Sequence, residues 1–521
     1  MIINLLFLRI IIAIKIHLIY NYHCVVYRLK VHAITMSIGI LKITRNLGFY
    51  AQMNSFPVIS NLKKANFVKR HGIDVFSIFV LCLISVFFGV PNLYALFQGP
   101  MAKDFGMSLD TVYRFLGNPN FNWRKLHLLF AKQAIDAVSG QKAGKTIRAF
   151  IVDDTCIERP DSFKTELVSR MYNHVDHRYF RGFGQLTLGW DDGKGFFPLN
   201  FAIDCAKKDE NLLFGIDKAA SKKTCGYVRR KESRESKPAL VVKMLKQALN
   251  AKIPATHVLM DTWFYSGKLF WQIANLGMRS VARIKTNLKF ISADKNCHGN
   301  GKMSQSEILE RLRVKLNDRN KDVYWVTVKN NEGMLLKLVF VNACGKNKFI
   351  SIVTDDLELS AEDIVGLYAR RWSIETNFKA QKQFFKLDSE CQGHLFDSII
   401  AFATIASIRY IVTELKRRME SDDSLLGGVF RDLVSDTQKA PFRDALNKLL
   451  ELIKDFRDYL RSHKALKHNK RLQQDIDEYL TTKMKSWFDD RLGFIQKMVA
   501  SAYEILVPKA DNEKAGVNFA I

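Results

Sequence analysis

Three acidic residues stand where a metal-dependent phosphoryl-transfer site could be built. Asp153 and Asp261 each follow an apolar run that predicts a strand, and Glu375 lies in a stretch of helical character. A sheet edge and a helix can bring three such carboxylates together. Their oxygens suit Mg²⁺, with Mn²⁺ as a substitute, because these hard ligands leave room for phosphate oxygens. Two ions about 3.5 to 4 Å apart would activate the attacking oxygen and stabilise the leaving oxygen.

The segment around Glu375 adds two cations and a phenol. Tyr368, Arg371, Glu375 and Lys382 recur at helical spacing, and at about 100° per residue one helix places them within about 60° on a single face. In a nuclease, Glu375 would bind metal while Arg371 and Lys382 hold the phosphates of the strand being cut. A solvated helix with Glu–Lys support gives the same pattern.

The four residues resemble the Y-R-E-K signature of the cut-and-paste DDE transposases of insertion sequences, in the insertion-sequence-four group. The runs that hold the two aspartates, Ile151–Thr155 and Val258–Gly267, and the segment Tyr172–Gly193 between them are also similar to that family. The resemblance extends over residues 149–394.

The resemblance implies an α/β fold in which a ribonuclease-H-like catalytic core is interrupted by a β-rich insertion and flanked by N- and C-terminal helical regions. It also implies two divalent metal ions, and DNA strand cleavage and strand transfer at the inverted repeats of a mobile element. The partners would be double-stranded DNA, at the element ends and the target, and a second copy of the chain in a synaptic homodimer.

The resemblance further implies roles for single residues. Asp153, Asp261 and Glu375 would be the catalytic metal ligands, and Tyr368, Arg371 and Lys382 would grip the terminal phosphates. The first acid is either Asp153 or Asp154. Thr155 favours Asp153, because the family commonly has Asp-x-Ser/Thr after this strand. Neighbours in an extended strand point to opposite faces, so only one of the two can face the metals.

The charge of the chain indicates a polyanionic partner. Its 79 Lys and Arg residues exceed its 52 Asp and Glu residues by 27, and the excess is spread along the chain. Nucleic acid therefore fits better than a membrane surface. The 48% of hydrophobic residues and only 10 prolines exclude a mostly disordered chain. Eight scattered cysteines without a C-x-x-C pair predict reduced thiols in a cytoplasmic protein.

Two apolar stretches raise the question of a membrane segment. Residues 1–14 are interrupted by Arg9, and a translation start placed too far upstream explains residues 1–52 better than an anchor does. Residues 75–90 are short of the roughly 20 needed to span a bilayer, so we expect a buried helix. The glycine-rich run at residues 140–146 has one residue too few between its glycines for a phosphate-binding loop and precedes a strand.

Ser108 is expected to cap a helix at Leu109–Leu116. This helix is either the second half of a helix-turn-helix, with Thr111, Tyr113 and Arg114 toward DNA, or an ordinary surface helix.

The pattern along the chain predicts six regions. The regions are a probable spurious or disordered extension (1–52), an N-terminal helical DNA-binding region (53–145), the first part of the core (146–285), a β-rich insertion (286–355), the second part of the core with the catalytic Glu helix (356–400) and a C-terminal helical region (401–521).

Other residues have a functional and a structural interpretation. The basic stretch Lys207–Lys237 is either a DNA-facing loop or a solvated connector. His174 and His177 could touch DNA but suit partly buried structural positions. Trp325 could stack on a flipped base, although core packing is favoured for it and for Trp263 and Trp372.

Three rival functions follow from the same sequence. One is a decayed or repurposed copy that binds DNA without cutting it. Another is a different ribonuclease-H-like nuclease, such as one that cuts branched DNA. The third is a membrane protein that uses residues 1–35 or 75–90.

Overall fold

The computed structural model describes residues 53–439 except 54, 100–101, 103–104, 140–145, 175, 217–220, 294–300, 317–321, 344–347 and 421–423. The chain divides into two compact units, residues 1–441 and 442–521. All described residues belong to the first unit. The expected extension at 1–52 and the end of the C-terminal helical region lie outside the described residues.

Five strands form the part of the sheet that carries the predicted acids. They lie in the order β4-β3-β1-β5-β6. β3 runs antiparallel to both β1 and β4, whereas β5 and β6 run parallel to β1. The sequence predicts a hairpin from Gln185–Trp190 and Phe196–Ile203, and this is confirmed as β3 and β4. The bounds are β1 (Ala149–Glu158), β3 (Arg178–Asp191), β4 (Phe196–Asp204), β5 (His257–Met260) and β6 (Arg279–Arg283).

The same sheet continues into the segment between β6 and the Glu375 region. β11 pairs antiparallel with β6, and β10, β9 and β7 follow in order. The sequence pattern predicts strands at Val323–Val328, Leu335–Val341 and Phe349–Thr354, and these are confirmed as β9, β10 and β11, but helix α12 was not predicted. The elements are β7 (Lys289–Ser292), β8 (Met303–Ser304), α12 (Gln305–Leu316), β9 (Val323–Lys329), β10 (Leu335–Ala343) and β11 (Lys348–Thr354).

The N-terminal described region is helical. The expected buried helix is α5, whose apolar side chains are almost all inaccessible to solvent. α7 begins and ends where Ser108 and the apolar spacing predicted, with the Ser108 hydroxyl accepting from the Thr111 backbone N–H. The bounds are α4 (Val58–Lys64), α5 (Val75–Ile84), η1 (Ser85–Phe88), α6 (Leu93–Gln98), α7 (Leu109–Leu116) and α8 (Trp123–Ser139).

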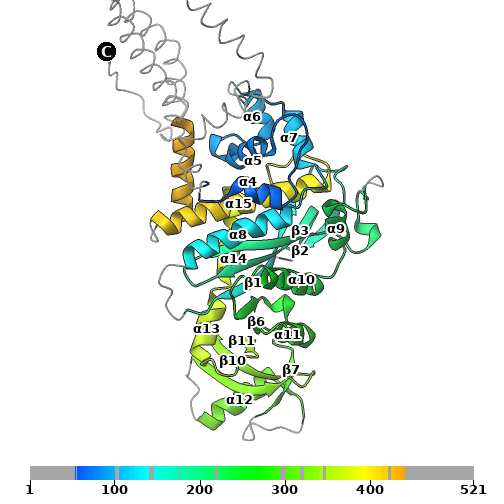
Figure 1. The fold of residues 1–521 in the computed structure, drawn as a ribbon. Helices are drawn as coiled ribbons and strands as arrows, with labels where there is room; N and C mark the ends of the chain where they lie inside the picture. The colour runs from blue at the N-terminus through cyan, green and yellow to red at the C-terminus, as the bar shows by residue number, and fades with distance from the viewer. Residues whose placement is uncertain are drawn as a thin grey trace, which may run out of the picture. The chain divides into compact units, whose positions relative to one another are not determined.

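Helices pack on the sheet around β1. In Figure 1, β1 lies between α14 (Trp372–Gln383) and α10 (Lys237–Asn250). α14 packs on β1, β4 and α15 (Phe396–Glu420). α13 (Ala361–Ala369) precedes α14, and α11 (Gly267–Ala274) packs on β6 and α10.

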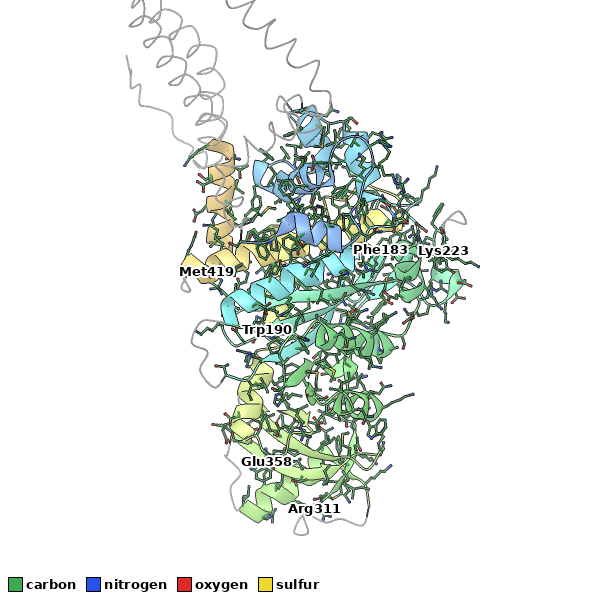
Figure 2. All side chains as sticks on the ribbon, in the orientation of Figure 1. Phe183, Trp190, Lys223, Arg311, Glu358 and Met419 are labelled. Carbon is green, nitrogen blue, oxygen red and sulfur yellow. The ribbon has the colours of Figure 1, made fainter. Side chains whose placement is uncertain are left out.

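The interior of the sheet is filled by large side chains. Phe183 and Trp190 on β3 are completely buried (Figure 2). The Trp190 indole N–H donates to the Pro254 carbonyl, 2.8 Å away, so burial leaves this polar group paired.

Within the described residues, α15 is the one helix long and apolar enough to cross a membrane by length and composition, and its apolar window is entirely buried in the protein. It also carries a charge that packing must satisfy. Arg409 is fully buried and bonds the Glu390 carboxylate, and it donates to the Leu83 carbonyl of α5. The ion pair offsets the cost of a buried guanidinium, and the bond to Leu83 joins α15 to the N-terminal helices.

The basic stretch Lys207–Lys237 was expected to be a DNA-facing loop or a solvated connector. Its second half is neither. It contains helix α9 (Cys225–Glu232), in which Arg230 is buried. Arg230 donates two hydrogen bonds to Glu166 and one to Asp397, at 2.6 to 2.7 Å. The charges that suggested DNA are in part used inside the protein, a pairing that sequence spacing alone cannot indicate.

Candidate functional site

The two aspartates follow paired positions of neighbouring parallel strands. β1 pairs with β5 from Ala149↔His257 to Val152↔Met260. Asp153 and Asp261 directly follow this paired segment, so both lie at the carboxyl end of β5. Carboxyl ends of parallel strands are where α/β sheets collect their functional side chains.

β1 does not end at Asp153 as the sequence predicted. It continues to Glu158, because β3 pairs with it beyond the point where β5 stops, with Asp153 opposite Thr187 and Asp154 opposite Leu186. Asp153 and Asp154, the polar residues that suggested a strand end, lie where β5 no longer pairs with β1. That edge of β1 is free to carry polar side chains.

Asp153 and Asp154 have different partners on opposite faces of β1. The Asp153 carboxylate accepts a hydrogen bond from Arg371, with the Oδ2 to Nη1 distance 2.8 Å. The Asp154 carboxylate instead accepts from the Lys237 ammonium of α10, also at 2.8 Å. The alternation expected of an extended strand thus gives only Asp153 access to the Glu375 helix.

The segment that holds Tyr368, Arg371, Glu375 and Lys382 is two helices, and the single helix expected here is wrong. α13 ends at Ala369 and α14 begins at Trp372. Arg370 explains the break: its side chain donates to the Ile147 carbonyl and to the Asp191 carboxylate, both at 2.7 Å. These bonds tie the junction to the ends of β1 and β3.

Arg371 links two of the predicted acids. Besides bonding Asp153, its Nη2 donates to Oε1 of Glu375, 2.5 Å away. The guanidinium side chain is 14% exposed, against 17% for Asp153 and 33% for Glu375. The three groups therefore form a partly buried cluster that remains open to solvent on the Glu375 side.

Tyr368 and Asp261 lie around the same guanidinium. The Arg371 guanidinium carbon is 5.9 Å from the centre of the Tyr368 ring. Burial raises the pKa of the Tyr368 phenol to about 12, and the charge of Asp261 acts in the same direction, although Arg371 opposes it. The phenol therefore stays protonated near neutral pH and can donate a hydrogen bond.

The electrostatics of Asp153 reflect its position. Burial raises its pKa to about 7, and the charges of Asp154 and Asp261 add to this effect. Arg371 and the backbone N–H of Asp154 lower it, but less than burial raises it. A carboxyl group in such surroundings is ionised at low cost only when further positive charge is nearby.

Lys382 lies farther along α14 than Glu375. It is half-buried two turns beyond Glu375 on α14, and its charge lowers the pKa of the Cys156 thiol, although burial raises that pKa overall. Cys156 follows Asp153 on β1, so α14 and β1 run alongside each other. Lys382 is not in contact with the acids, and a phosphate chain could extend from one to the other.

Asp153, Asp261 and Glu375 supply carboxylate oxygens, the type of ligand that a divalent cation such as Mg²⁺ prefers. Asp153 is also largely buried, so a bound cation would offset its charge. Among the described residues, however, no three His, Cys, Asp or Glu side chains are arranged closely enough to hold a metal ion. The Arg371 guanidinium spans Asp153 and Glu375 instead.

Three tryptophans are more exposed than expected. Core packing was favoured for Trp263, Trp325 and Trp372, but they are 52%, 49% and 64% exposed. Trp263 lies beside the Lys237 ammonium, which is 5.0 Å from its ring centre. His174 and His177 are also exposed, so the buried structural interpretation is wrong for them.

Sequence reasoning missed Lys237 and Arg370, which hold Asp154 and the helix junction. Arg370 stands directly before Arg371, so a paired arginine next to the signature was the available signal. For Lys237 there was no such signal in the sequence, because its partner Asp154 is far away along the chain.

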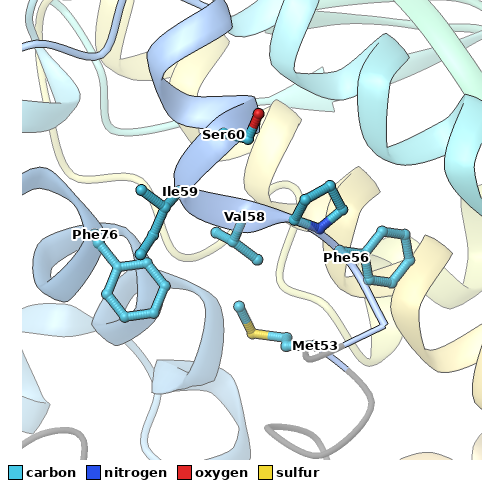
Figure 3. A pocket seen from close by; sticks show the side chains of 7 residues that line it. Met53, Phe56, Val58, Ile59, Ser60 and Phe76 are labelled. Carbon is cyan, nitrogen blue, oxygen red and sulfur yellow. The ribbon is translucent and has the colours of Figure 1, made fainter.

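An apolar pocket lies away from these acids, among the N-terminal helices (Figure 3). Met53, Phe56, Val58 and Phe76 line it together with Pro57, Ile59 and Ser60. It has no ionisable side chain, so it offers no group for acid–base or metal chemistry.

Comparisons with known proteins agree with the chemistry of the acids. A model described as DDE superfamily endonuclease matches residues 99–308, and one described as transposase DDE domain matches residues 225–394. Together these ranges include Asp153, Asp261 and Glu375. The matches support a DDE transposase, an enzyme of the nuclease type, without distinguishing the insertion-sequence-four group.

Among solved structures, a piggyBac transposase synaptic complex with hairpin DNA is similar at 13% identity and a TM-score of 0.39, covering 85% of each chain. No curated protein matches the chain.

Proposed function

We propose that this protein is a cut-and-paste transposase that cleaves and joins DNA at the inverted repeats of its own mobile element. The observation that carries the proposal is the Arg371 guanidinium, which joins Asp153 to Glu375 beside the parallel strand that leads into Asp261. The strand order β4-β3-β1-β5-β6 supports a ribonuclease-H-like core, with β7 to β11 as the insertion.

Asp153, Asp261 and Glu375 would hold two Mg²⁺ ions, for which Mn²⁺ would substitute. When bound, these ions supply the positive charge that stabilises the attacking and leaving oxygens of phosphoryl transfer. The side chains themselves fix the geometry. Arg371 is held at the acids by two hydrogen bonds, so it can present its remaining N–H groups to a phosphate.

The other signature residues would place the DNA strand. Tyr368 stays protonated and donates to a phosphate oxygen, and Lys382 binds a phosphate farther along α14. In the first step, water attacks the phosphorus at the element end, and the bond to the 3′-oxygen breaks to free a 3′-hydroxyl. In strand transfer, that hydroxyl attacks a target phosphodiester and displaces its 3′-oxygen.

A homodimer on two element ends and a cytoplasmic location complete the proposal. The large positive charge of the chain would hold flanking and target DNA through phosphate contacts. The regions at 53–145 and 401–521 would bind DNA or the second copy.

The experiment uses the full chain and a labelled duplex that carries the DNA bordering its gene. Cleavage should require Mg²⁺ or Mn²⁺, and Glu375→Gln should slow it by about a thousandfold or more, since a metal ligand is lost. Glu362→Gln, on the exposed start of α13, is the matched control and should cleave normally. Equal rates for the native chain and Glu375→Gln, or no cleavage by either, would refute the proposal.

A further inference from the structure

A second surface combines aromatic rings and arginines on the outer part of the β2–β3 hairpin. β2 (Ser169–Asn173) pairs antiparallel with β3, and the register sets Arg170 opposite Arg181 and Tyr172 opposite Tyr179. Alternate residues share a face of a sheet, so these four side chains lie on the same side. We call this side, together with the adjacent Phe163, the hairpin face.

The rings and cations of the hairpin face are stacked on one another. The Arg170 guanidinium is 4.3 Å from the centre of the Tyr179 ring, and that of Arg181 is 3.8 Å from the Phe163 ring. The Tyr172 and Tyr179 rings meet edge to face with their centres 5.1 Å apart. His174 extends the series, its ring centre 5.0 Å from that of Tyr172.

These rings are exposed to a degree that folding alone does not explain. Phe163 is 65%, Tyr179 60% and Tyr172 40% exposed. Each guanidinium covers one side of a ring, which leaves other ring surface open to solvent. A group of large exposed apolar side chains on one surface marks a binding site more often than a single exposed one does.

The charges of the hairpin face suit an anionic partner. Among the described residues, no carboxylate lies within ion-pair distance of Arg170 or Arg181, whereas Arg178 at the hairpin end pairs with Glu158 and Asp176. Within this part of the chain, the Arg170 and Arg181 charges are therefore not paired with a carboxylate. Flat rings alternating with such cations fit bases that stack and phosphates that lie between them.

The geometry distinguishes between paired and unpaired DNA. A duplex presents phosphates and base edges at its surface, but its base faces are covered by stacking. Exposed rings on an open sheet can be used only by bases whose faces are free. Thr187 on β3 is the partner of Asp153. Arg181 and Tyr179 lie six and eight residues before it on the same strand, so the hairpin face is about 20 to 26 Å from Thr187 along β3.

We infer that the hairpin face binds a stretch of unpaired DNA, with bases stacked on Tyr172, Tyr179 and Phe163 and phosphates held by Arg170 and Arg181. This function goes beyond the proposed cleavage of duplex ends at the acids. Only the choice of DNA as the nucleic acid rests on the proposed function. A strand separated from its complement near a cut end would be the natural occupant.

The test measures binding of the full chain to a labelled single strand of about 20 nucleotides by fluorescence anisotropy, in EDTA so that no cleavage occurs. Tyr172→Ala combined with Tyr179→Ala should weaken single-strand binding by about tenfold or more, because two stacking rings are lost. Binding of a blunt duplex should change by less than about threefold. Tyr172→Phe with Tyr179→Phe keeps both rings and is the matched control.

Photocrosslinking keeps the inference testable if the double alanine variant fails to fold. An oligonucleotide of the same length with 5-bromodeoxyuridine should crosslink to residues 163–181 of the native chain, and Arg170→Gln should reduce the yield. Equal single-strand affinity for the alanine and phenylalanine variants, crosslinks elsewhere only, or tighter binding of the matching RNA would overturn the inference. Because metal is absent, these outcomes do not depend on whether the acids cut DNA.

Discussion

At the residue scale, Arg371 is the group that connects the candidate site. It contacts Asp153 on β1 and Glu375 on α14, which are distant in sequence. A planar guanidinium can bond two carboxylates at once, whereas an ammonium is a point charge. Its role is therefore a matter of shape as well as of charge.

Replacement of Arg371 by Lys keeps the charge but cannot span both acids. We expect DNA cleavage to slow by about a hundredfold, the size of effect seen when one preorganised donor is lost. Circular dichroism melting should show a folded protein. Arg313→Lys on α12, remote from the acids, should cleave at the native rate. A native rate for Arg371→Lys would show that bridging is dispensable.

Residue types singled out the acids and the signature as candidates, because phosphoryl transfer limits which side chains can take part. Contacts between remote elements were not predictable in the same way. Nothing near Asp154 in sequence indicates Lys237, and nothing near Tyr172 indicates how Arg170 and Tyr179 stack.

At the element scale, local signals located most strands and helices, and long-range pairing decided where they end. α7 agrees with its predicted bounds because its cap is encoded by Ser108. β1 runs past Asp153 because β3 supplies a partner, and the junction of α13 and α14 forms because Arg370 reaches the sheet. Partners of this kind are absent from a local pattern.

The packing of α8 on β4 predicts a pH dependence of stability. His127 of α8 is buried with its ring centre 5.8 Å from that of Phe201. Burial, and then the charge of Arg229, lower the pKa of His127 to about 3. The unfolded chain, with the ordinary value of 6.5, then binds more protons than the folded one between these values. Stability is therefore present above pH 6.5 and is lost as the pH falls toward 3.

The measurement is the free energy of unfolding in urea for the native chain and His127→Leu. Leucine cannot titrate, so the variant should gain on the native chain as the pH falls, by about 1.4 kcal/mol for one unit below 6.5. His174→Leu, at an exposed histidine, serves as the control and should show no such gain. Parallel pH profiles for native and His127→Leu would contradict the burial argument.

At the scale of the whole molecule, the positive charge of the chain would set how DNA is held in the proposed function. The excess of 27 positive charges belongs to the full chain, although buried arginines such as Arg230 and Arg409 are used within the fold. Composition therefore predicts a polyanionic partner but overstates the charge that is available to it. The continuous sheet from β4 to β7 was likewise not predictable, since the segment at 286–355 showed only that it was rich in strands.

The affinity for duplex DNA should depend steeply on salt. Each phosphate neutralised by Lys or Arg releases counterions, so the logarithm of the binding constant falls linearly with the logarithm of salt concentration. For about six to ten phosphate contacts, we expect a loss of about 10³ to 10⁵ in affinity between 50 and 200 mM salt. Anisotropy titrations over that range measure the slope, and an affinity insensitive to salt would exclude phosphate contacts as its source.

The central claim, that Asp153 and not its neighbour works with Asp261 and Glu375, is tested by comparing Asp153→Asn with Asp154→Asn. Both changes remove one charge from the same strand, but only Asp153 faces Arg371 and Glu375. Cleavage of a labelled element end in Mg²⁺ should fall by about a thousandfold or more for Asp153→Asn and by less than about tenfold for Asp154→Asn. Equal losses for the two variants, or a larger loss for Asp154→Asn, would contradict the account.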